Sequence, residues 1–323
     1  MRTNLTHHRV RAASALVVLV ALLVVPAGST GATTQLGAQF DKVTIAAIAL
    51  DPAGPLMYAK DMGFFRQQGI DAEILLVADG TQTVPALLSG QAQFTGVPPS
   101  GLAILKTNHL PVKAVAALGI YRPRLPTTGV FVAPGRRISR AQDLVGKTIN
   151  VDFQNSVAHI GLLRWLQRGG VSRDEVEFST LPFAQSVAPL LRGDFDAAVL
   201  TEPQATLALQ GGARRIALPF DSVCSEDCLL AVVIARSDVD RNLAARFRNA
   251  VQAAAVWANQ KRNQAASARI LARYASIKPA LVEKMTRTPY ATRFRVGMAR
   301  PWIDLYAEYD LIPDSFTPAD LVK

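Results

Sequence analysis

Histidine is scarce in this chain of 323 residues, and the shortage limits the metal chemistry that the protein can carry. Two of the four histidines, His7 and His8, lie near the start of the chain, and only His109 and His159 remain further along. A zinc site built from several histidines needs more ligands than these two residues supply. We therefore expect no metal site and no cofactor.

Cysteine is equally rare, because Cys224 and Cys228 are the only two in the chain. Their spacing is one residue longer than in the CxxC motif of dithiol exchange, and no histidine lies nearby to complete a metal site. In an exported protein the pair can form a disulfide that closes a small loop, and this is the interpretation we favour. Two reduced thiols are the alternative, because so short a loop demands a specific geometry.

Long apolar runs are absent except near the start of the chain. There Arg2, Arg9 and Arg11 precede an apolar run at residues 12–25, and small residues follow it. This order is typical of a secretory signal peptide. The alternative is a membrane anchor, but the run is shorter than the ~20 residues that span a bilayer. We predict a signal peptide at residues 1–32 and an exported protein, in the periplasm or at the cell surface.

Positive charge is in excess, with 35 basic against 25 acidic residues and a formal net charge of +10. Such an excess suits an anionic solute or an anionic envelope surface, because a net field raises the local concentration of counter-ions. The basic residues are dispersed over predicted helix faces, however, and few aromatic residues lie between them. This pattern argues against a groove for nucleic acid, and we expect no such partner.

Strand-like and helical segments alternate along the chain, which indicates an α/β fold in which helices cover the sheets. The predicted strands are residues 43–50, 72–77, 92–95, 112–118, 129–132, 148–152, 175–180, 197–201 and 229–235. The predicted helices are residues 56–68, 82–89, 101–107, 158–168, 185–192, 203–210, 241–264, 267–274 and 278–287. The order strand, helix, strand at the start predicts a parallel crossover unit.

Two segments interrupt this alternation and suggest a division into two lobes. Residues 121–128 are rich in proline and polar side chains, and residues 219–227 form a second break before an apolar strand. The chain without its signal peptide is long enough for two lobes with separate cores. We predict that residues 41–125 and 226–323 build lobe 1 and that residues 126–225 build lobe 2.

Four segments resemble the solute-binding proteins of ABC importers for sulfonates, nitrate, taurine and thiamine precursors. They are residues 51–74, 89–100, 143–159 and 192–203, and the third is the most specific match. The resemblance implies a two-lobed type II periplasmic-binding-protein-like fold, in which each lobe is a mixed, mostly parallel sheet flanked by helices. It also implies a ligand cleft between the lobes, and a monomer that captures a small solute by interlobe closure. The implied partners are an ABC permease and its ATPase.

Five residues of the predicted lobe 1 are candidates for contact with the solute. Asp51 follows the first strand, where open α/β sheets bind ligands, but it could instead hold an Asx-type turn. Thr81 follows the second strand and could either cap a helix or contact solute. Pro98, Pro99 and Ser100 open a helix whose free N–H groups suit an oxyanion, or they form a plain helix start.

In the predicted lobe 2, Gln154, Asn155 and Ser156 lie at a strand-to-helix turn that could complete the anion site. Asn155 replaces the glycine that is usual in the family, and asparagine can adopt the left-handed conformation. His159 lies on the same helical face as Ser156, so it could either reach the cleft or pack behind the turn.

Thr201 and Glu202 end the strand at residues 197–201 beside the predicted cleft. A glutamate would repel an anion, but it would accept hydrogen bonds from an amine or a ring N–H of a solute. A local cap or salt bridge is an equally good role for Glu202.

The main alternative to a binding protein is an enzyme on the same fold, such as a menaquinone-pathway dehydratase. We expect no enzyme, because Ser156 and His159 lack an evident third partner and the Gly-x-Ser-x-Gly motif is absent. The predicted signal peptide also argues against a cytosolic enzyme. A surface receptor without transport would share all these features, and the sequence does not select one solute.

Overall fold

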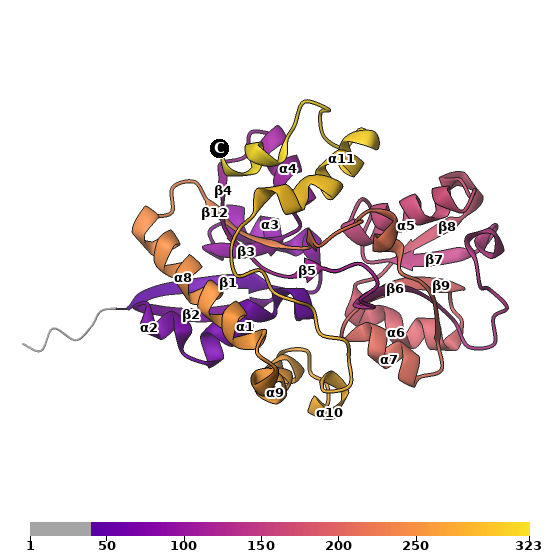
Figure 1. Ribbon diagram of the computed structural model, residues 1–323, viewed down its shortest axis with the longest axis horizontal. Helices are drawn as coiled ribbons and strands as arrows, with labels where there is room; N and C mark the ends of the chain where they lie inside the picture. Colours follow the sequence, from indigo (N-terminus) through magenta and orange to yellow (C-terminus); the bar gives the residue numbers. More distant parts are fainter. Residues whose placement is uncertain (1–39) are drawn as a thin grey trace, which may run out of the picture. The chain divides into compact units, whose positions relative to one another are not determined.

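The computed structural model describes residues 40–323, so the predicted signal peptide lies outside the described residues. Two five-stranded sheets and one two-stranded sheet form the framework of this part of the chain. Figure 1 shows the two larger sheets, with their helices, as separate groups of elements joined by a few chain crossings. Among residues 40–323, no helix combines the length and the apolar character that crossing a membrane requires.

The first sheet is built from both ends of the described chain, in the order β2-β1-β3-β12-β4. Its strands are β1 (Asp41–Ala47), β2 (Ile70–Leu76), β3 (Phe94–Val97), β4 (Val112–Ala117) and β12 (Val232–Arg236). Strand β1 is parallel to β2 and β3, as the predicted crossover unit requires, whereas β12 is antiparallel to β3 and β4. The chain therefore returns to this sheet after it has built the second one.

The second sheet has the order β10-β6-β9-β7-β8 and comes from the middle of the chain. Its strands are β6 (Thr128–Val132), β7 (Thr148–Val151), β8 (Glu177–Thr180), β9 (Ala197–Thr201) and β10 (Arg214–Ala217). Strand β7 is parallel to β8 and β9, and β6 is antiparallel to β9 and β10. Every residue of β6 and β9 is buried, as expected for central strands covered on both faces.

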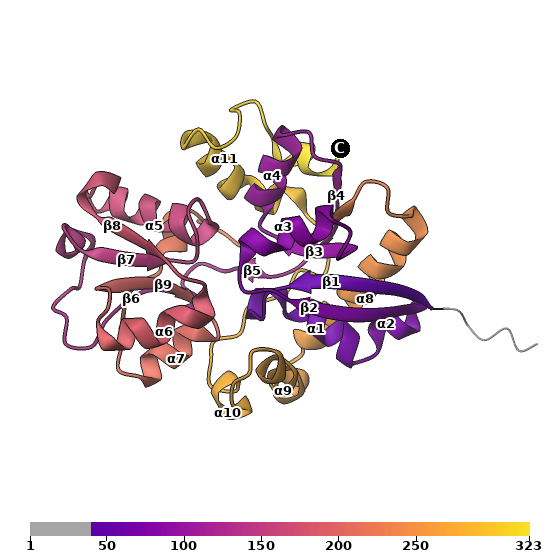
Figure 2. The ribbon, with the colours of Figure 1, turned by 180° about the vertical axis from the view of Figure 1, so that it is seen from behind.

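Helices cover both sheets, and Figure 2 shows the same arrangement from behind. The helices are α1 (Gly54–Asp61), α2 (Phe64–Gln67), α3 (Gly80–Leu88), α4 (Pro99–Thr107), α5 (Val157–Arg168), α6 (Phe183–Arg192), α7 (Gln204–Gln210), α8 (Arg241–Ala258), α9 (Gln264–Tyr274), α10 (Pro279–Val282) and α11 (Arg300–Glu308). Helices α1 and α8 pack together in the core of the first sheet, where the rings of Phe94 and Phe247 stack 3.8 Å apart. Each such buried ring contributes about 1.5–3 kcal/mol to folding.

Several element boundaries differ from the sequence prediction for local reasons. The helix predicted at residues 56–68 is broken into α1 and α2, because Gly63 adopts a left-handed φ of 76° between them. The strand predicted from residue 175 begins at Glu177, because Ser172 and Glu175 form a capping box around a short 3-10 turn. The helix predicted at residues 278–287 is only α10, and the one at 241–264 ends at Ala258.

Two segments of the chain cross between the two five-stranded sheets, and these segments contact each other. Strands β5 (Ile120–Tyr121) and β11 (Cys228–Leu229) pair antiparallel, so the outgoing and returning crossings run side by side. The structure joins Cys224 and Cys228 in a disulfide with their Cα atoms 6.1 Å apart. The Tyr121 hydroxyl also donates a hydrogen bond of 2.7 Å to Asp221. The crossings therefore form one small braced unit between the sheets.

Candidate functional site

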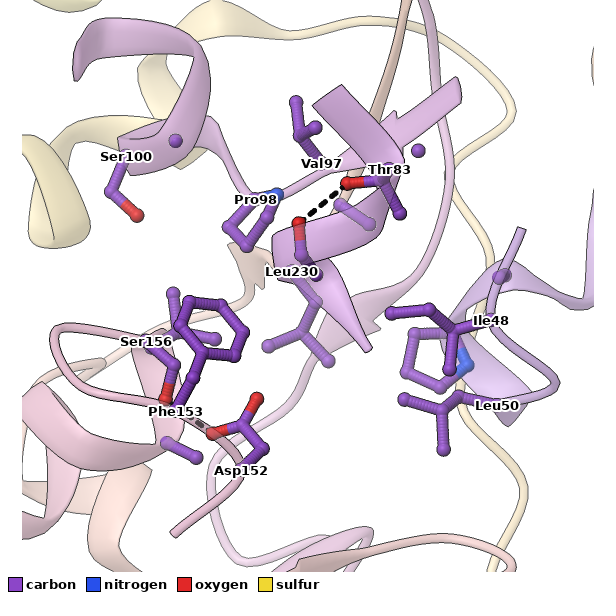
Figure 3. Close-up of a pocket in the computed structure, with 18 of the residues that line it drawn as sticks. Ile48, Leu50, Thr83, Val97, Pro98, Ser100, Asp152, Phe153, Ser156 and Leu230 are labelled. Carbon is purple, nitrogen blue, oxygen red and sulfur yellow. Dashed lines mark hydrogen bonds between the residues drawn. The ribbon is translucent and has the colours of Figure 1, made fainter. Parts of the chain in front are cut away.

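A cavity of about 380 Å³ lies between residues of the first sheet and residues of the second sheet. Its walls come from the loop after β1 and from the starts of α3, α4 and α5, together with Thr201 at the end of β9. These positions follow the carboxyl ends of strands, where open α/β sheets bind their ligands. Figure 3 shows side chains from both sheets facing this space.

Most of the cavity wall is apolar. The apolar side chains labelled in Figure 3 are Ile48, Leu50, Val97, Pro98, Phe153 and Leu230. The Phe153 ring packs so closely on the start of α3 that a Cβ added at Gly80 would lie 2.8 Å from it. None of the described residues that line the cavity is a lysine, an arginine or a histidine. Asp152 is the one charged residue among them.

Asp152 directly follows β7 and has 9% of its surface exposed. The Ser156 hydroxyl donates a hydrogen bond to its Oδ1 atom, and Figure 3 shows the other carboxylate oxygen facing the open space. Burial raises the pKa of Asp152 to about 7, although the hydrogen bond from Ser156 acts to lower it. The carboxyl group therefore changes its protonation state close to neutral pH.

The turn between β7 and α5 holds Asn155 and Ser156 at the cavity wall. Asn155 adopts a left-handed φ of 60°, the conformation that the usual glycine of this motif would take. Ser156 is the N-cap of α5, and its hydroxyl accepts a hydrogen bond of 3.1 Å from the backbone N–H of His159. Gln154, which lies in the same turn, is exposed and does not line the cavity.

His159 packs behind this turn and does not line the cavity. It is fully buried, its Nδ1 atom accepts a hydrogen bond of 2.9 Å from the Asn155 N–H, and its ring lies 4.7 Å from that of Phe178. Burial lowers the pKa of His159 to about 4, so the imidazole is neutral at physiological pH. The structure therefore places His159 behind the turn, and contact of His159 with a solute stays a prediction.

At the start of α4, Pro98 is the N-cap, and the side chains of Pro98 and Ser100 line the cavity while Pro99 does not. Ser100 is 1% exposed, and its Oγ atom makes no hydrogen bond among residues 40–323, although it lies near the Tyr306 hydroxyl. Tyr306 of α11 lines the same region, and its hydroxyl donates a hydrogen bond of 2.7 Å to the Asn155 carbonyl. A buried hydroxyl without a partner at a cavity wall is a group that a ligand can satisfy.

The start of α3 adds a third helix N-terminus to the wall. The Asp79 side chain caps this helix by accepting hydrogen bonds from the backbone N–H and the hydroxyl of Thr81, at 2.8 and 2.5 Å. Thr81 lines the cavity, but its hydroxyl is held by this cap. Thr83, which was not among the predicted residues, also lines the cavity and donates to the Gly80 carbonyl at 2.8 Å.

The side chains of Thr201 and Glu202, at the end of β9, have different surroundings. Thr201 lines the cavity and donates a hydrogen bond of 3.1 Å to the Thr127 carbonyl. Glu202 lies outside the lining and caps α7, because its carboxylate accepts hydrogen bonds from the N–H and the hydroxyl of Thr206 at 3.1 and 2.9 Å. Burial raises the pKa of Glu202 to about 7. The Glu202 carboxylate is thus bonded locally, and its contact with a solute stays a prediction.

Asp51 is fully buried and does not line the cavity. Its carboxylate accepts hydrogen bonds from Arg287 Nε at 3.1 Å, from the Thr288 N–H at 2.6 Å and from the Tyr290 hydroxyl at 2.7 Å. These partners lie in the segment that leads toward α11. These bonds anchor the C-terminal segment to the first sheet, and contact of Asp51 with a solute stays a prediction.

Sequence reasoning missed several residues of the cavity. Asp152 was assigned to the end of a strand, although an acidic residue at the carboxyl end of a strand, next to a helix start, is itself a signal for a site. Tyr306 carried no local signal, because only the folding of α11 beside α4 and α5 brings it to the cavity. No group of three or more His, Cys, Asp or Glu residues within 40–323 is placed to hold a metal ion.

Comparisons with known proteins show what this chain is similar to in sequence and in fold. Over 143 residues, 44% of this chain, the sequence is 29% identical to the taurine-binding periplasmic protein of Escherichia coli (strain K12). The match covers 43% of that relative, so the chain spans less than half of its length.

Two solved structures are similar to this chain in fold. The alkanesulfonate-binding protein SsuA from Xanthomonas axonopodis pv. citri, bound to MOPS, has a TM-score of 0.72 and 20% identity over 87% of this chain and 98% of its own. The desulfurization enzyme DSZB has a TM-score of 0.65 and 17% identity over 87% of this chain and 96% of its own.

At these identities the two solved structures show the shared fold alone. The fold is that of the two-lobed type II periplasmic binding proteins, as the sequence resemblance implied. The family model described as NMT1/THI5 like matches residues 53–265, and the chain belongs to this family. The resemblance to periplasmic solute-binding proteins is thereby confirmed.

Proposed function

We propose that this protein is the exported substrate-binding protein of an ABC importer and that it holds one small solute in the cavity between its two sheets. Residues 41–125 and 226–323 form one lobe, and residues 126–225 form the other. The lobes close over the solute, and the closed form delivers it to a membrane permease that works with an ATPase. The observation that carries this proposal is the cavity itself, which has three helix starts in its wall, together with the Ser100 hydroxyl, which makes no hydrogen bond within residues 40–323.

Contacts between the lobes support closure as the binding event. The Asp51 N–H donates a hydrogen bond of 3.3 Å to the Glu202 carbonyl, and Tyr306 donates one to the Asn155 carbonyl. The Phe153 ring lies against Gly80 at the mouth of the same space. A solute that contacts both lobes favours the arrangement in which these contacts are made, because it binds the closed form more tightly than the open one.

An enzyme on this fold is the second candidate, and the DSZB match shows that the fold also occurs in an enzyme. The geometry favours binding over catalysis. His159 is buried behind the α5 turn and does not line the cavity, so it is not placed to act as a general base on a bound substrate. The Ser156 hydroxyl donates a hydrogen bond to Asp152, but it also accepts the His159 N–H as the N-cap of α5, so it is held in a structural role at the start of this helix. Turnover of a bound solute by the purified protein would favour the enzyme.

Substitution of Leu50 by tryptophan is expected to abolish solute binding, because the indole would fill the cavity beside Pro52 and Ile48. The full chain would be purified without denaturant from its native cells, and the solute released on unfolding would be identified by mass spectrometry. Leu209→Trp is the matched control, since Leu209 is 41% exposed and lies outside the cavity. Equal amounts of the same solute from both variants would contradict the assignment of the cavity.

Ser100→Ala is expected to weaken binding of that solute by about five- to tenfold, the value of one neutral hydrogen bond. The same change should alter the stability of the unliganded protein by less than about 1 kcal/mol, because Ser100 Oγ makes no hydrogen bond among the described residues. Isothermal titration calorimetry and urea unfolding of the unliganded protein separate the two effects. A loss of stability without a loss of affinity would give Ser100 a structural role instead.

A further inference from the structure

We propose that the solute carries a positively charged nitrogen, such as an ammonium or amidinium group, which pairs with the Asp152 carboxylate inside the cavity. This inference rests on the proposed function and narrows its solute class. It differs from the sequence expectation, which assigned the acceptor for an N–H group to Glu202. Glu202 lies outside the cavity and is occupied by Thr206, whereas Asp152 lies in the cavity wall.

The charge balance around Asp152 carries the argument. The described groups that face it are the Ser156 hydroxyl, the backbone N–H groups of Asp152 and Phe153, Asp79 at the start of α3 and the Tyr306 hydroxyl. The hydroxyl and N–H groups act to stabilise the carboxylate, but none of these groups is a cation. A buried carboxylate without a counter-ion is unfavourable, and none of the described residues in the cavity wall is basic. A solute cation would remove this penalty, and a charge-assisted hydrogen bond to Asp152 would add to its affinity. A simple anion such as nitrate or an alkanesulfonate would instead be repelled by an ionised Asp152.

The side chains around the cavity also indicate the polarity of the rest of the solute. Ser100, Asp152 and Ser156 lie on one side of the space in Figure 3, together with the apolar side chains of Pro98 and Phe153, and Ile48 and Leu50 lie across from them. The side that holds Asp152 therefore offers polar groups between apolar side chains, and Ile48 and Leu50 offer apolar contacts across the space. We infer a solute with a cationic head and a short apolar body, on which Ser100 provides a second polar contact.

A protonated Asp152 could alternatively donate a hydrogen bond to an anionic solute, and pH separates the two cases. Burial raises the pKa of Asp152 to about 7, so the carboxylate forms as the pH rises through neutrality. A cationic solute then binds more tightly at pH 8 than at pH 6, whereas an anion that needs the protonated acid binds more weakly at pH 8. The sign of this change identifies the charge of the head group.

The experiment uses 2-phenylethylamine, 2-phenylethanol and phenylacetate, which share an apolar body and differ in the charge of the head. Binding of each probe to the full chain is measured by calorimetry at pH 6 and pH 8. We expect the amine to bind about tenfold or more tightly than the other two at pH 8, and this preference to disappear in Asp152→Asn. Glu202→Gln is the matched control, because it neutralises a second buried acid outside the cavity and should keep the preference for the amine.

Three results would overturn the inference. They are a preference for phenylacetate, an unchanged preference for the amine in Asp152→Asn, and a retained native solute without a basic nitrogen. The pH dependence of the unmodified protein provides the same test should the variant fail to fold. If the unmodified protein binds no probe and retains no native solute, the proposed function itself fails. A native solute that lacks a basic nitrogen would overturn this inference alone.

Discussion

Replacement of Arg287 by methionine is expected to lower the free energy of unfolding by about 3–5 kcal/mol, the cost of leaving a buried carboxylate without its partner. Arg287 Nη2 lies 3.0 Å from Asp51 Oδ1, with side chains that are 13% and 0% exposed. The same guanidinium donates to the hydroxyls of Ser267 and Tyr58, at 3.1 and 2.6 Å. Methionine keeps much of the length of the arginine stem and removes all of these bonds.

Urea unfolding followed by circular dichroism would measure this loss. Arg273→Met is the matched control, because Arg273 is 66% exposed where it pairs with Asp61, and an exposed pair is worth about 0–1 kcal/mol. The double variant Asp51→Asn with Arg287→Met should recover part of the loss, since it removes the buried charge as well. A loss below about 1 kcal/mol for Arg287→Met would contradict the view that this buried pair fastens the C-terminal segment to the first sheet.

Asp152→Asn is expected to make the unliganded protein about 2–4 kcal/mol more stable at pH 8 and to leave it unchanged near pH 4. The pKa of Asp152 is raised from 3.8 to about 7 by burial. Between these two values the folded protein binds more protons than the unfolded chain, so a rising pH lowers the stability of the folded state. Asparagine does not ionise, and its side-chain oxygen can still accept the hydrogen bond from Ser156.

The test compares urea unfolding of both proteins at pH 4, 6 and 8, without solute. Glu202 has its pKa raised to about 7 by burial too, so the unmodified protein alone would show a combined effect. The difference between the two proteins isolates Asp152. A constant difference across the pH range would mean that Asp152 does not titrate near neutrality. A gain in stability together with a loss of solute affinity is the trade-off expected of a binding residue.

Much of the fold could be predicted because its signals are local. Strands β6, β7 and β9 are short apolar runs bounded by turn residues, and their predicted bounds differ from the structure by no more than one residue. Strand β10 was missed because it carries Arg214 and Arg215 on the edge of the second sheet and shows no apolar run. Strands β5 and β11 are only two residues each, and they exist because the two crossing segments meet in space.

The residues of the candidate site that could be predicted are those that lie just after a strand. Ser100, Asn155 and Ser156 lie where a strand gives way to a helix, and the structure brings all three to one cavity. Asp51 and Glu202 also follow strands, but Glu202 is held by Thr206, four residues further on, and Asp51 is held by residues that are distant in the sequence. Arg287 and Tyr290 are more than 230 residues from Asp51 in the sequence, and no local pattern reports such a contact.

A crystal structure of the protein purified with its native solute would test the central claim most directly. The proposal predicts one solute molecule in the cavity between the sheets, within hydrogen-bonding distance of Ser100 Oγ and with a basic nitrogen against the free oxygen of Asp152. A solute bound on the outer surface, with the cavity filled by rearranged side chains, would contradict it.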